Sequence, residues 1–221
     1  MVQIENYLLQ LKNLLLRQYG ERLVYMGLQG SYLRGEATDS SDIDVMVVID
    51  QLSVLDLDQY RIIVSSLEEP EKSCGFICSK TDLANWNPLE IGQLLHGTKD
   101  YYGALDQLVP AYTQKDLCNF VKLSLNNLYH EICHRYIHAD HRKNAAGLPG
   151  TYKGVFFILQ NLYDLRYGEY IPTKDQLLPL LKGKDRAVLE RSMQLGKGAS
   201  YDFSESFSLL FSWCQETLRS L

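Results

Sequence analysis

The pattern of apolar and polar residues changes character once along the chain, near residue 110. Before that point, segments with helical spacing alternate with short apolar runs bounded by turn residues, which predicts helices and strands in one domain. After it, only helical periodicity is found. We therefore expect an α+β fold, with a mixed α/β domain over residues 1–110 and an all-helical domain over residues 111–221.

The individual elements follow from the same pattern. Apolar residues at helical spacing predict helices over residues 3–18 and 53–68, and helical segments over residues 81–97 that break at Pro88. Short apolar or β-branched runs predict strands, at residues 23–26, 42–50 and 73–79. Candidate helices of the second half cover residues 114–139, 151–167, 173–182, 184–193 and 203–219. Glycine and proline are expected to interrupt the chain between them, notably at Gly147, Pro149 and Gly150.

Composition and charge narrow the classes of function. The chain has 221 residues, of which 46% are hydrophobic, and a formal net charge of −5. Proteins that grip long nucleic acids usually carry a basic excess, so we do not expect a nucleic-acid partner. No apolar run approaches the roughly 18 residues that cross a bilayer, and the N-terminal segment lacks the features of a signal peptide. Five scattered cysteines indicate reduced thiols, and we expect a cytoplasmic protein with no membrane partner.

Gly30 and Ser31 lie in the turn-rich connection that follows the first predicted strand. A glycine at this place lets the backbone come close to a ligand. If Ser31 begins a short helix, its hydroxyl and the following backbone N–H groups face a phosphate. The segment is therefore a candidate nucleotide-binding turn.

Two acids stand at the start of the second predicted strand. Side chains two residues apart on a strand point to the same face, so Asp42 and Asp44 are expected side by side. Paired carboxylates repel each other, and a hard divalent cation such as Mg²⁺ relieves that repulsion through oxygen ligands. The neighbouring apolar residues are expected in the core behind the sheet, namely Ile43, Val45, Val47 and Val48.

The sequence Gly30-Ser31, ten residues, then Asp42-Ile43-Asp44 resembles the signature of the DNA polymerase β-like nucleotidyltransferase superfamily. Arg34-Gly35 and Ser41 resemble its small bacterial members, which include aminoglycoside nucleotidyltransferases and the minimal MNT-type proteins. The resemblance implies a catalytic domain with a mixed sheet of the polymerase β-like type. It also implies that the helical domain supplies specificity for the acceptor.

The resemblance implies roles for these residues. Asp42 and Asp44 would hold one or two Mg²⁺ ions, Gly30, Ser31 and nearby N–H groups would hold the β- and γ-phosphates, and Arg34 is a further phosphate candidate. The implied reaction is transfer of a nucleoside monophosphate, expected to be AMP, from a nucleoside triphosphate to a hydroxyl of a small molecule such as an aminoglycoside-like antibiotic. Two alternatives stay open: a transferase that modifies a partner protein, like the MNT antitoxins, and a nucleotide- or partner-binding module without turnover. The sequence also leaves open whether the chain is a homodimer.

One feature departs from the superfamily, which places a third carboxylate on the later strand. That strand, residues 73–79, contains no acid, and Gly75 is expected at the acid's position. Glu71 before the strand and Asp82 after it are candidates to replace the acid, as is Glu131 from the helical half.

Histidines repeat along one predicted helix. His130, His134 and His138 are spaced i, i+4 and i+8, so they share one helix face. Such a stripe can bind zinc, line a substrate cleft or an interface, or lie on an ordinary surface. We retain His130 and His134, with Glu131, as candidates for acceptor binding or for the base.

Overall fold

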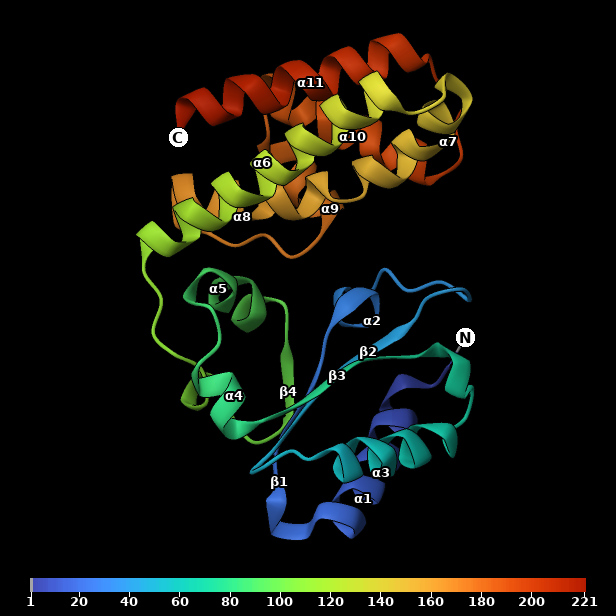
Figure 1. Ribbon diagram of the computed structural model, residues 1–221, viewed down its shortest axis with the longest axis vertical. Coiled ribbons are helices and arrows are strands. Elements are labelled where there is room, and N and C mark those ends of the chain that lie inside the picture. The colour runs from blue at the N-terminus through green and yellow to red at the C-terminus, as the bar shows by residue number, and fades with distance from the viewer. Residues whose placement is uncertain (1) are drawn as a thin grey trace. The chain divides into compact units, whose positions relative to one another are not determined.

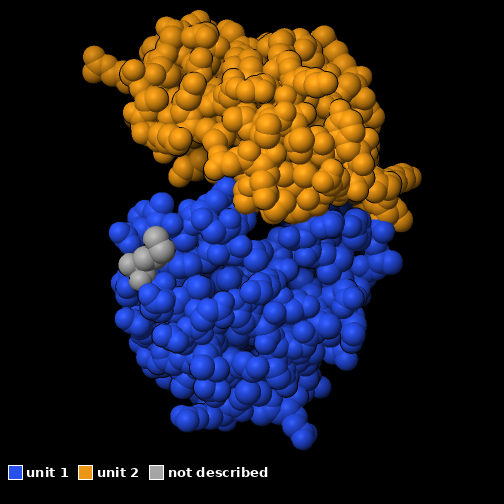
Figure 2. Space-filling view, turned by 180° about the vertical axis from the view of Figure 1, so that it is seen from behind, with its two compact units in different colours: residues 1–112 blue, residues 113–221 orange. Residues whose placement is uncertain are grey.

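The computed structural model describes residues 2–221. The chain forms two compact units, residues 1–112 and residues 113–221, which Figure 2 draws in different colours. The change of hydrophobic pattern expected near residue 110 lies close to this division. In the part of the chain that the structure describes, no helix is both long and apolar enough to cross a membrane.

Unit 1 is built on a four-stranded mixed sheet with the strand order β3-β2-β1-β4. The strands are β1 (Leu23–Leu28), β2 (Ile43–Ile49), β3 (Ser73–Ser79) and β4 (Lys99–Tyr102). β1 pairs antiparallel with both β2 and β4, whereas β2 pairs parallel with β3. The three predicted strands are confirmed. β4 was not predicted, because its sequence KDYY has no apolar run and only its pairing with β1 makes it a strand.

Helices cover both faces of this sheet (Figure 1). On one face lie α1 (Ile4–Tyr19) and α3 (Val54–Ser65), and on the other lie α4 (Lys80–Ala84) and α5 (Pro88–His96). The predicted helices at the start of the chain and after Ser53 are therefore present. The expected break at Pro88 is also confirmed, because α5 begins at that residue, where a missing N–H costs nothing.

Each face of the sheet carries its own apolar core. β2 contributes residues to both cores, because successive side chains of a strand point to opposite faces. Its odd-numbered residues pack with α1 and α3, and its even-numbered residues Met46 and Val48 pack with the α4 side. The expectation that Val48 lies with Ile43, Val45 and Val47 is therefore wrong about the face, although all four are buried. The even-numbered face is also the face of Asp44.

Polar contacts join α1, α3 and the end of β2. Ser53 and Asp56 form a capping box at the start of α3, and the Tyr19 hydroxyl donates to the Asp56 carbonyl at 2.9 Å. Arg22 donates to the Asp56 carboxylate at 2.9 Å and to that of Asp50 at 3.0 Å. These contacts hold the pKa of Asp56 well below its usual range, chiefly through the hydrogen bond from Arg22 and then that from Ser53.

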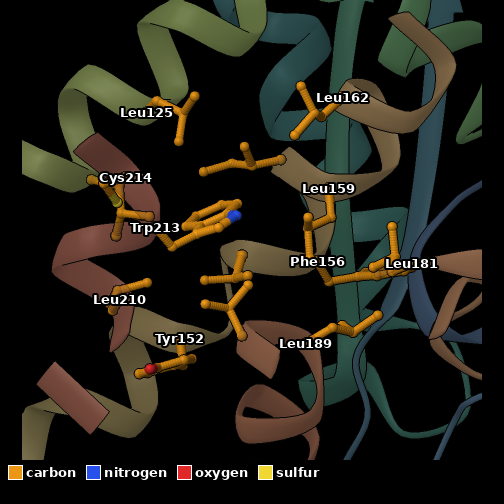
Figure 3. Close-up of a cluster of buried hydrophobic side chains, with 14 of the residues drawn as sticks. Leu125, Tyr152, Phe156, Leu159, Leu162, Leu181, Leu189, Leu210, Trp213 and Cys214 are labelled. Carbon is orange, nitrogen blue, oxygen red and sulfur yellow. The ribbon is translucent and has the colours of Figure 1, made fainter. Parts of the chain in front are cut away.

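Unit 2 is all helical. Its helices are α6 (Gln114–His138), α7 (His141–Tyr152), α8 (Val155–Tyr167), α9 (Lys174–Leu177), α10 (Gly183–Gly196) and α11 (Phe203–Ser220). They enclose one apolar core in which Trp213 lies among leucine, tyrosine and phenylalanine side chains (Figure 3). The expected all-helical character of this half is confirmed.

α7 corrects the expectation that Gly147, Pro149 and Gly150 interrupt the chain, because all three lie inside this helix. Burial of Leu148, with that of Asn144, Thr151 and Tyr152, outweighs the low helix propensity. Pro149 has no N–H for the carbonyl of Ala145, four residues earlier. The Tyr201 hydroxyl donates to that carbonyl instead, which compensates the missing bond.

Candidate active site

Asp42 and Asp44 lie at the beginning of β2. Asp42 immediately precedes the strand and is exposed, whereas Asp44 is its second residue and is half-buried. They are two residues apart in extended backbone, so both belong to the face that carries Met46 and Val48. The rest of β2 is almost completely buried. The acids therefore stand where a rigid core strand reaches the surface.

Gly30 brings the turn after β1 against the second acid. Its φ is +70°, and a Cβ built on it would lie 1.9 Å from Asp44 Oδ2. The preceding residue supports the same approach, since the Gln29 N–H donates to the Asp44 carbonyl at 2.8 Å. Both the backbone conformation and the space beside the carboxylate require glycine here. The expected Gly-Ser turn and the acidic strand are therefore in direct contact.

Ser31 lies in the short helix α2 (Gly30–Arg34), as its second residue. Its carbonyl accepts from the Glu36 N–H at 2.9 Å, whereas no hydrogen bond joins its hydroxyl to another described residue. Arg34 is in a different situation, because its Nε donates to Glu36 Oε2 at 3.0 Å. Ser31 thus keeps a donor for a phosphate, while a phosphate contact by Arg34 would have to compete with Glu36. Both assignments stay predictions.

The residue beside Asp44 on β3 is Cys74, not Gly75. The parallel register pairs Asp44 with Cys74 and Val45 with Gly75. Cys74 is exposed, yet desolvation by its surroundings chiefly raises the pKa of its thiol. The backbone hydrogen bond with Gly75 lowers this pKa, whereas the hydrogen bond to Asp44 and the charges of Asp44 and Asp42 raise it further. Gly75 has no room for a side chain, since a Cβ there would lie 2.2 Å from the Val45 carbonyl oxygen. A thiol therefore occupies the place next to the acid pair.

Asp82 does not take the place of the missing third carboxylate. Its carboxylate caps α4, accepting from the Ser79 hydroxyl at 2.6 Å and from the Ser79 N–H at 3.2 Å. Ser79 ends β3, so five residues of strand, or roughly 17 Å, separate it from Cys74. Glu71 lies in a 3₁₀ turn before β3, between Pro70 and Lys72. Neither of these acids lies on the strand itself.

Among the residues that the structure describes, no basic side chain pairs with the acids at the start of β2, Asp42 and Asp44. In the same part of the chain, no three histidine, cysteine or acidic residues are arranged to hold a metal ion. Two hard-oxygen side chains of like charge fit a divalent cation that takes its other ligands from water or phosphate. This donor set matches Mg²⁺ at one position, whereas the neighbouring thiol is a soft donor.

The remaining predicted residues belong to unit 2. Glu131 Oε1 accepts from Arg135 at 3.0 Å and from the Thr151 hydroxyl at 3.0 Å. His130 and His134 are exposed on α6, with ring centroids 5.9 Å apart. Within the described residues these histidines are not part of a three-ligand metal group. A role for any of the three in catalysis or acceptor binding stays a prediction.

Two contacts near the acid pair could not be predicted from the local sequence pattern. The first is Cys74, whose position required the register of β2 and β3. The second is Gln29, whose side chain donates to the Thr98 hydroxyl at 2.8 Å, next to β4. The sequence places Gln29 immediately before Gly30, which indicates that it belongs to the same turn. Its partner Thr98 lies 69 residues away in sequence, so the contact itself could not be predicted.

Comparison with known proteins agrees with this geometry. Residues 9–83 match the family model described as the nucleotidyltransferase domain, and this span contains the Gly-Ser turn and both aspartates. The match of residues 9–83 to a nucleotidyltransferase domain confirms the resemblance noted from the sequence.

Solved structures extend the likeness beyond this domain. Spectinomycin adenyltransferase AAD(9) from Enterococcus faecialis, crystallised with ATP and spectinomycin, shares 13% sequence identity. The match covers 97% of this chain and 99% of that protein, with a TM-score of 0.61. It shows a shared α+β fold with a C-terminal helical part. No curated protein matches the chain significantly in sequence.

A second structure, of a toxin-antitoxin with AMP-PNP, shares 22% identity over 60% of this chain and 93% of that one. Its TM-score is 0.33, which does not establish a common fold.

Proposed function

We propose that the chain is a magnesium-dependent enzyme that transfers a nucleoside monophosphate, expected to be AMP, from a nucleoside triphosphate to a hydroxyl of a small molecule. The contact between Gly30 and Asp44 carries this proposal. It joins a glycine turn suited to phosphate with two carboxylates that no basic side chain of the described residues neutralises. The likeness to a protein crystallised with ATP and spectinomycin supports a nucleotide and a small molecule as partners.

In this mechanism the residues of unit 1 bind and orient the triphosphate. Asp42 and Asp44 would hold Mg²⁺, which would neutralise negative charge on the phosphates. The Ser31 hydroxyl donates to a phosphate oxygen. Gly30 keeps the turn close to Asp44, so that the α-phosphorus is presented to the attacking hydroxyl in a fixed geometry.

Cys74 raises a second candidate function. The group next to Asp44 is an exposed thiol, whose pKa is raised chiefly by desolvation and further by the neighbouring acids. A protonated thiol is a poor base for an attacking hydroxyl. This observation favours a nucleotide-binding module without turnover, in which Asp42, Asp44 and the triphosphate share one cation.

The test is incubation of the purified protein with Mg²⁺ and α-phosphate-labelled nucleoside triphosphates, against a panel of hydroxyl-bearing small molecules that includes spectinomycin. Asp44→Asn is the variant that removes the site. Asp58→Asn is its matched control, an exposed acid on α3 outside the site. Label on a small molecule that disappears in Asp44→Asn alone supports the proposal.

The same assay separates the alternatives. Label that appears on protein indicates a protein-modifying transferase. Nucleotide binding without transfer to any acceptor, together with transfer by Cys74→Asp or Cys74→Glu, indicates a module that lost its base at this position. Equal transfer by the parent and by Asp44→Asn would contradict the assignment of the site.

A further inference from the structure

α3 exposes large apolar side chains on the face that it turns away from the sheet. Val54 and Leu55 are each 75% exposed, and Ile62 is 64% exposed. The opposite side of the same helix is buried, with Asp56 and Ile63 as its buried residues. Single exposed apolar residues are ordinary on protein surfaces, whereas several on one helix form a patch that marks an interaction site.

The helical repeat gathers these residues into one stripe along α3. With 3.6 residues per turn, positions 54, 55, 58, 61 and 62 fall within about a third of the helix circumference; we call these five residues the α3 stripe. In its middle, Arg61 Nη2 donates to Asp58 Oδ1 at 2.8 Å, and both side chains are exposed. The order along the stripe is therefore apolar, charged, apolar.

The α3 stripe is complementary to itself when two copies meet antiparallel. A two-fold axis through its middle places Asp58 of each protomer opposite the partner's Arg61. The same axis brings Leu55 of each protomer against the partner's Ile62, because residues whose numbers have nearly the same sum meet in an antiparallel pair. Both apolar ends are covered in this arrangement, and each ion pair gains a second partner.

The order of charges also decides which partner fits the stripe. In a parallel pairing about a two-fold axis, Asp58 would face the partner's Asp58 and Arg61 would face the partner's Arg61, and like charges repel. A purely apolar surface would leave the central ion pair covered without polar contacts, which costs free energy. A second copy of α3 in the antiparallel direction satisfies the apolar ends and the charged middle together.

Within unit 1 the stripe lies away from the acid pair. α3 packs on the face of the sheet that carries the odd-numbered residues of β2, whereas Asp44 belongs to the face of Met46 and Val48. α1 lies beside α3 in the same layer (Figure 1), and its Leu9, which is 59% exposed, is a further apolar residue of that layer. A contact through α3 therefore does not use the surface around the acids.

We infer that the α3 stripe is the contact surface of a homodimer, in which α3 of one protomer packs antiparallel against α3 of its partner. Leu55 and Ile62 supply the apolar contacts, and Asp58 and Arg61 supply the charged ones. The inference goes beyond the proposed function, because the contact needs neither nucleotide nor metal. Transfer is not its readout, so Asp58→Asn keeps its place as a control for transfer.

The size of the contact sets the expected affinity. A helix of 12 residues is roughly 18 Å long, so an interface built around it falls at the low end of the sizes of specific interfaces. We therefore expect a dimer that dissociates in the micromolar range, and association has to be measured as a function of protein concentration.

The test measures the molar mass of the full-length protein by sedimentation equilibrium, without nucleotide or metal, over about 1–200 μM. We expect the mass to rise from that of the 25.4 kDa chain toward twice this value as the concentration increases. Leu55→Glu and Ile62→Glu should each weaken association roughly tenfold or more, because a carboxylate from each protomer enters an apolar contact.

A matched control separates the stripe from exposed apolar residues in general. Ile137 is an isoleucine of α6 in unit 2 and is 71% exposed, so Ile137→Glu should associate like the parent. The melting temperature of each variant, measured at low concentration, should equal that of the parent, since every replaced side chain is exposed.

Exchanged charges test the middle of the contact. Asp58→Arg alone gives a stripe with two arginines, and Arg61→Asp alone gives a stripe with two aspartates, so neither variant should associate with itself as the parent does. An equimolar mixture of the two variants should form heterodimers, because each arginine of one chain then faces an aspartate of the other. The double variant Asp58→Arg, Arg61→Asp should dimerise like the parent.

Three outcomes would overturn the inference. The first is a monomer at every concentration, and the second is a dimer that persists in Ile62→Glu and in both single charge variants, since the copies then meet through another surface. The third is a mixture of Asp58→Arg and Arg61→Asp that stays monomeric. Transfer by a strict monomer contradicts this inference alone, and a dimer without transfer contradicts the proposed function alone.

Discussion

The acid pair of unit 1 and Glu131 of unit 2 have opposite surroundings. In unit 1, Asp42 and Asp44 stand together at the end of a core strand, and no ion pair of the described residues reaches them. In unit 2, Glu131 stands on a helix and is bound on one oxygen by both Arg135 and Thr151. An acid pair without a basic partner can take a cation from solution, whereas a carboxylate that is already paired offers only its remaining oxygen.

The difference follows from secondary structure. A strand sends alternate side chains to one face, so two like charges can be placed side by side and held by the core beneath them. On a helix, residues four apart are neighbours, and a charged pair there tends to satisfy itself. We therefore expect substitutions in the acid pair to act on nucleotide chemistry, and substitutions in unit 2 to act on packing or on a separate ligand.

The largest effect is expected at the acid pair. On the proposed function, Asp42→Asn or Asp44→Asn should lower transfer roughly a hundredfold or more, because each variant removes a proposed metal ligand. The melting temperature without metal should stay the same or rise, since repulsion between like charges is relieved. Labelled-nucleotide transfer and thermal unfolding are measured on the same samples. Transfer at the parent rate by either variant would contradict the expectation that the acid pair of unit 1 acts on nucleotide chemistry.

The next effect is expected at Gly30. Gly30→Ala forces an alanine to φ +70° and places its Cβ against Asp44, so transfer should fall about tenfold or more, and the free energy of unfolding by about 1–2 kcal/mol. Gly35→Ala is the matched control, because Gly35 also has φ +70° but nothing lies within 4 Å of an added Cβ. Similar losses of transfer in both variants would show that backbone strain, not the approach to Asp44, is responsible.

A third prediction compares two capping boxes, one in each unit. The pKa of Asp56 in unit 1 is lowered by Arg22 and Ser53, and that of Asp116 in unit 2 by Thr113. A carboxylate with a lowered pKa in the folded state stabilises the fold above its unfolded pKa near 3.8 and loses this contribution as pH falls through the folded value. Asp56→Ala should therefore cost about 1–2 kcal/mol at pH 7, with a smaller cost below pH 3.8.

Asp116→Ala should cost less, since no arginine joins that capping box. Urea unfolding at several pH values measures the free-energy cost of each variant and how that cost changes with pH. The indole N–H signals of Trp86 and Trp213 report on units 1 and 2 separately. A cost of Asp56→Ala that does not change with pH would assign its effect to packing instead of charge.

The smallest effect is expected in α7. Tyr201→Phe removes the donor that serves the Ala145 carbonyl, so the free energy of unfolding should fall by about 1 kcal/mol. In the Pro149→Ala background the helix regains its own N–H donor, so the same substitution should cost less. A double-mutant cycle measures this coupling. Additive effects of the two substitutions would show that the Tyr201 bond does not compensate for Pro149.

Much of unit 1 could be predicted because its signals are local. The β-branched and apolar composition of residues 42–50 identifies a strand, and the spacing of Asp42 and Asp44 places them on one face of it. A glycine in the turn after a strand indicates a close backbone approach, which Gly30 makes. The division into a mixed and an all-helical half also follows from periodicity alone, since each kind of element has its own repeat.

Only the tertiary structure decided which residues meet across the chain. Cys74 stands beside Asp44 because β2 and β3 pair in parallel with one register, and a shift of one residue would have placed Gly75 there. α7 continues through Pro149 because burial of its apolar face and the Tyr201 hydroxyl outweigh propensity. Local pattern determines the type of an element and the direction of its side chains, whereas register and the partners of buried polar groups depend on free energies of packing summed over residues distant in sequence.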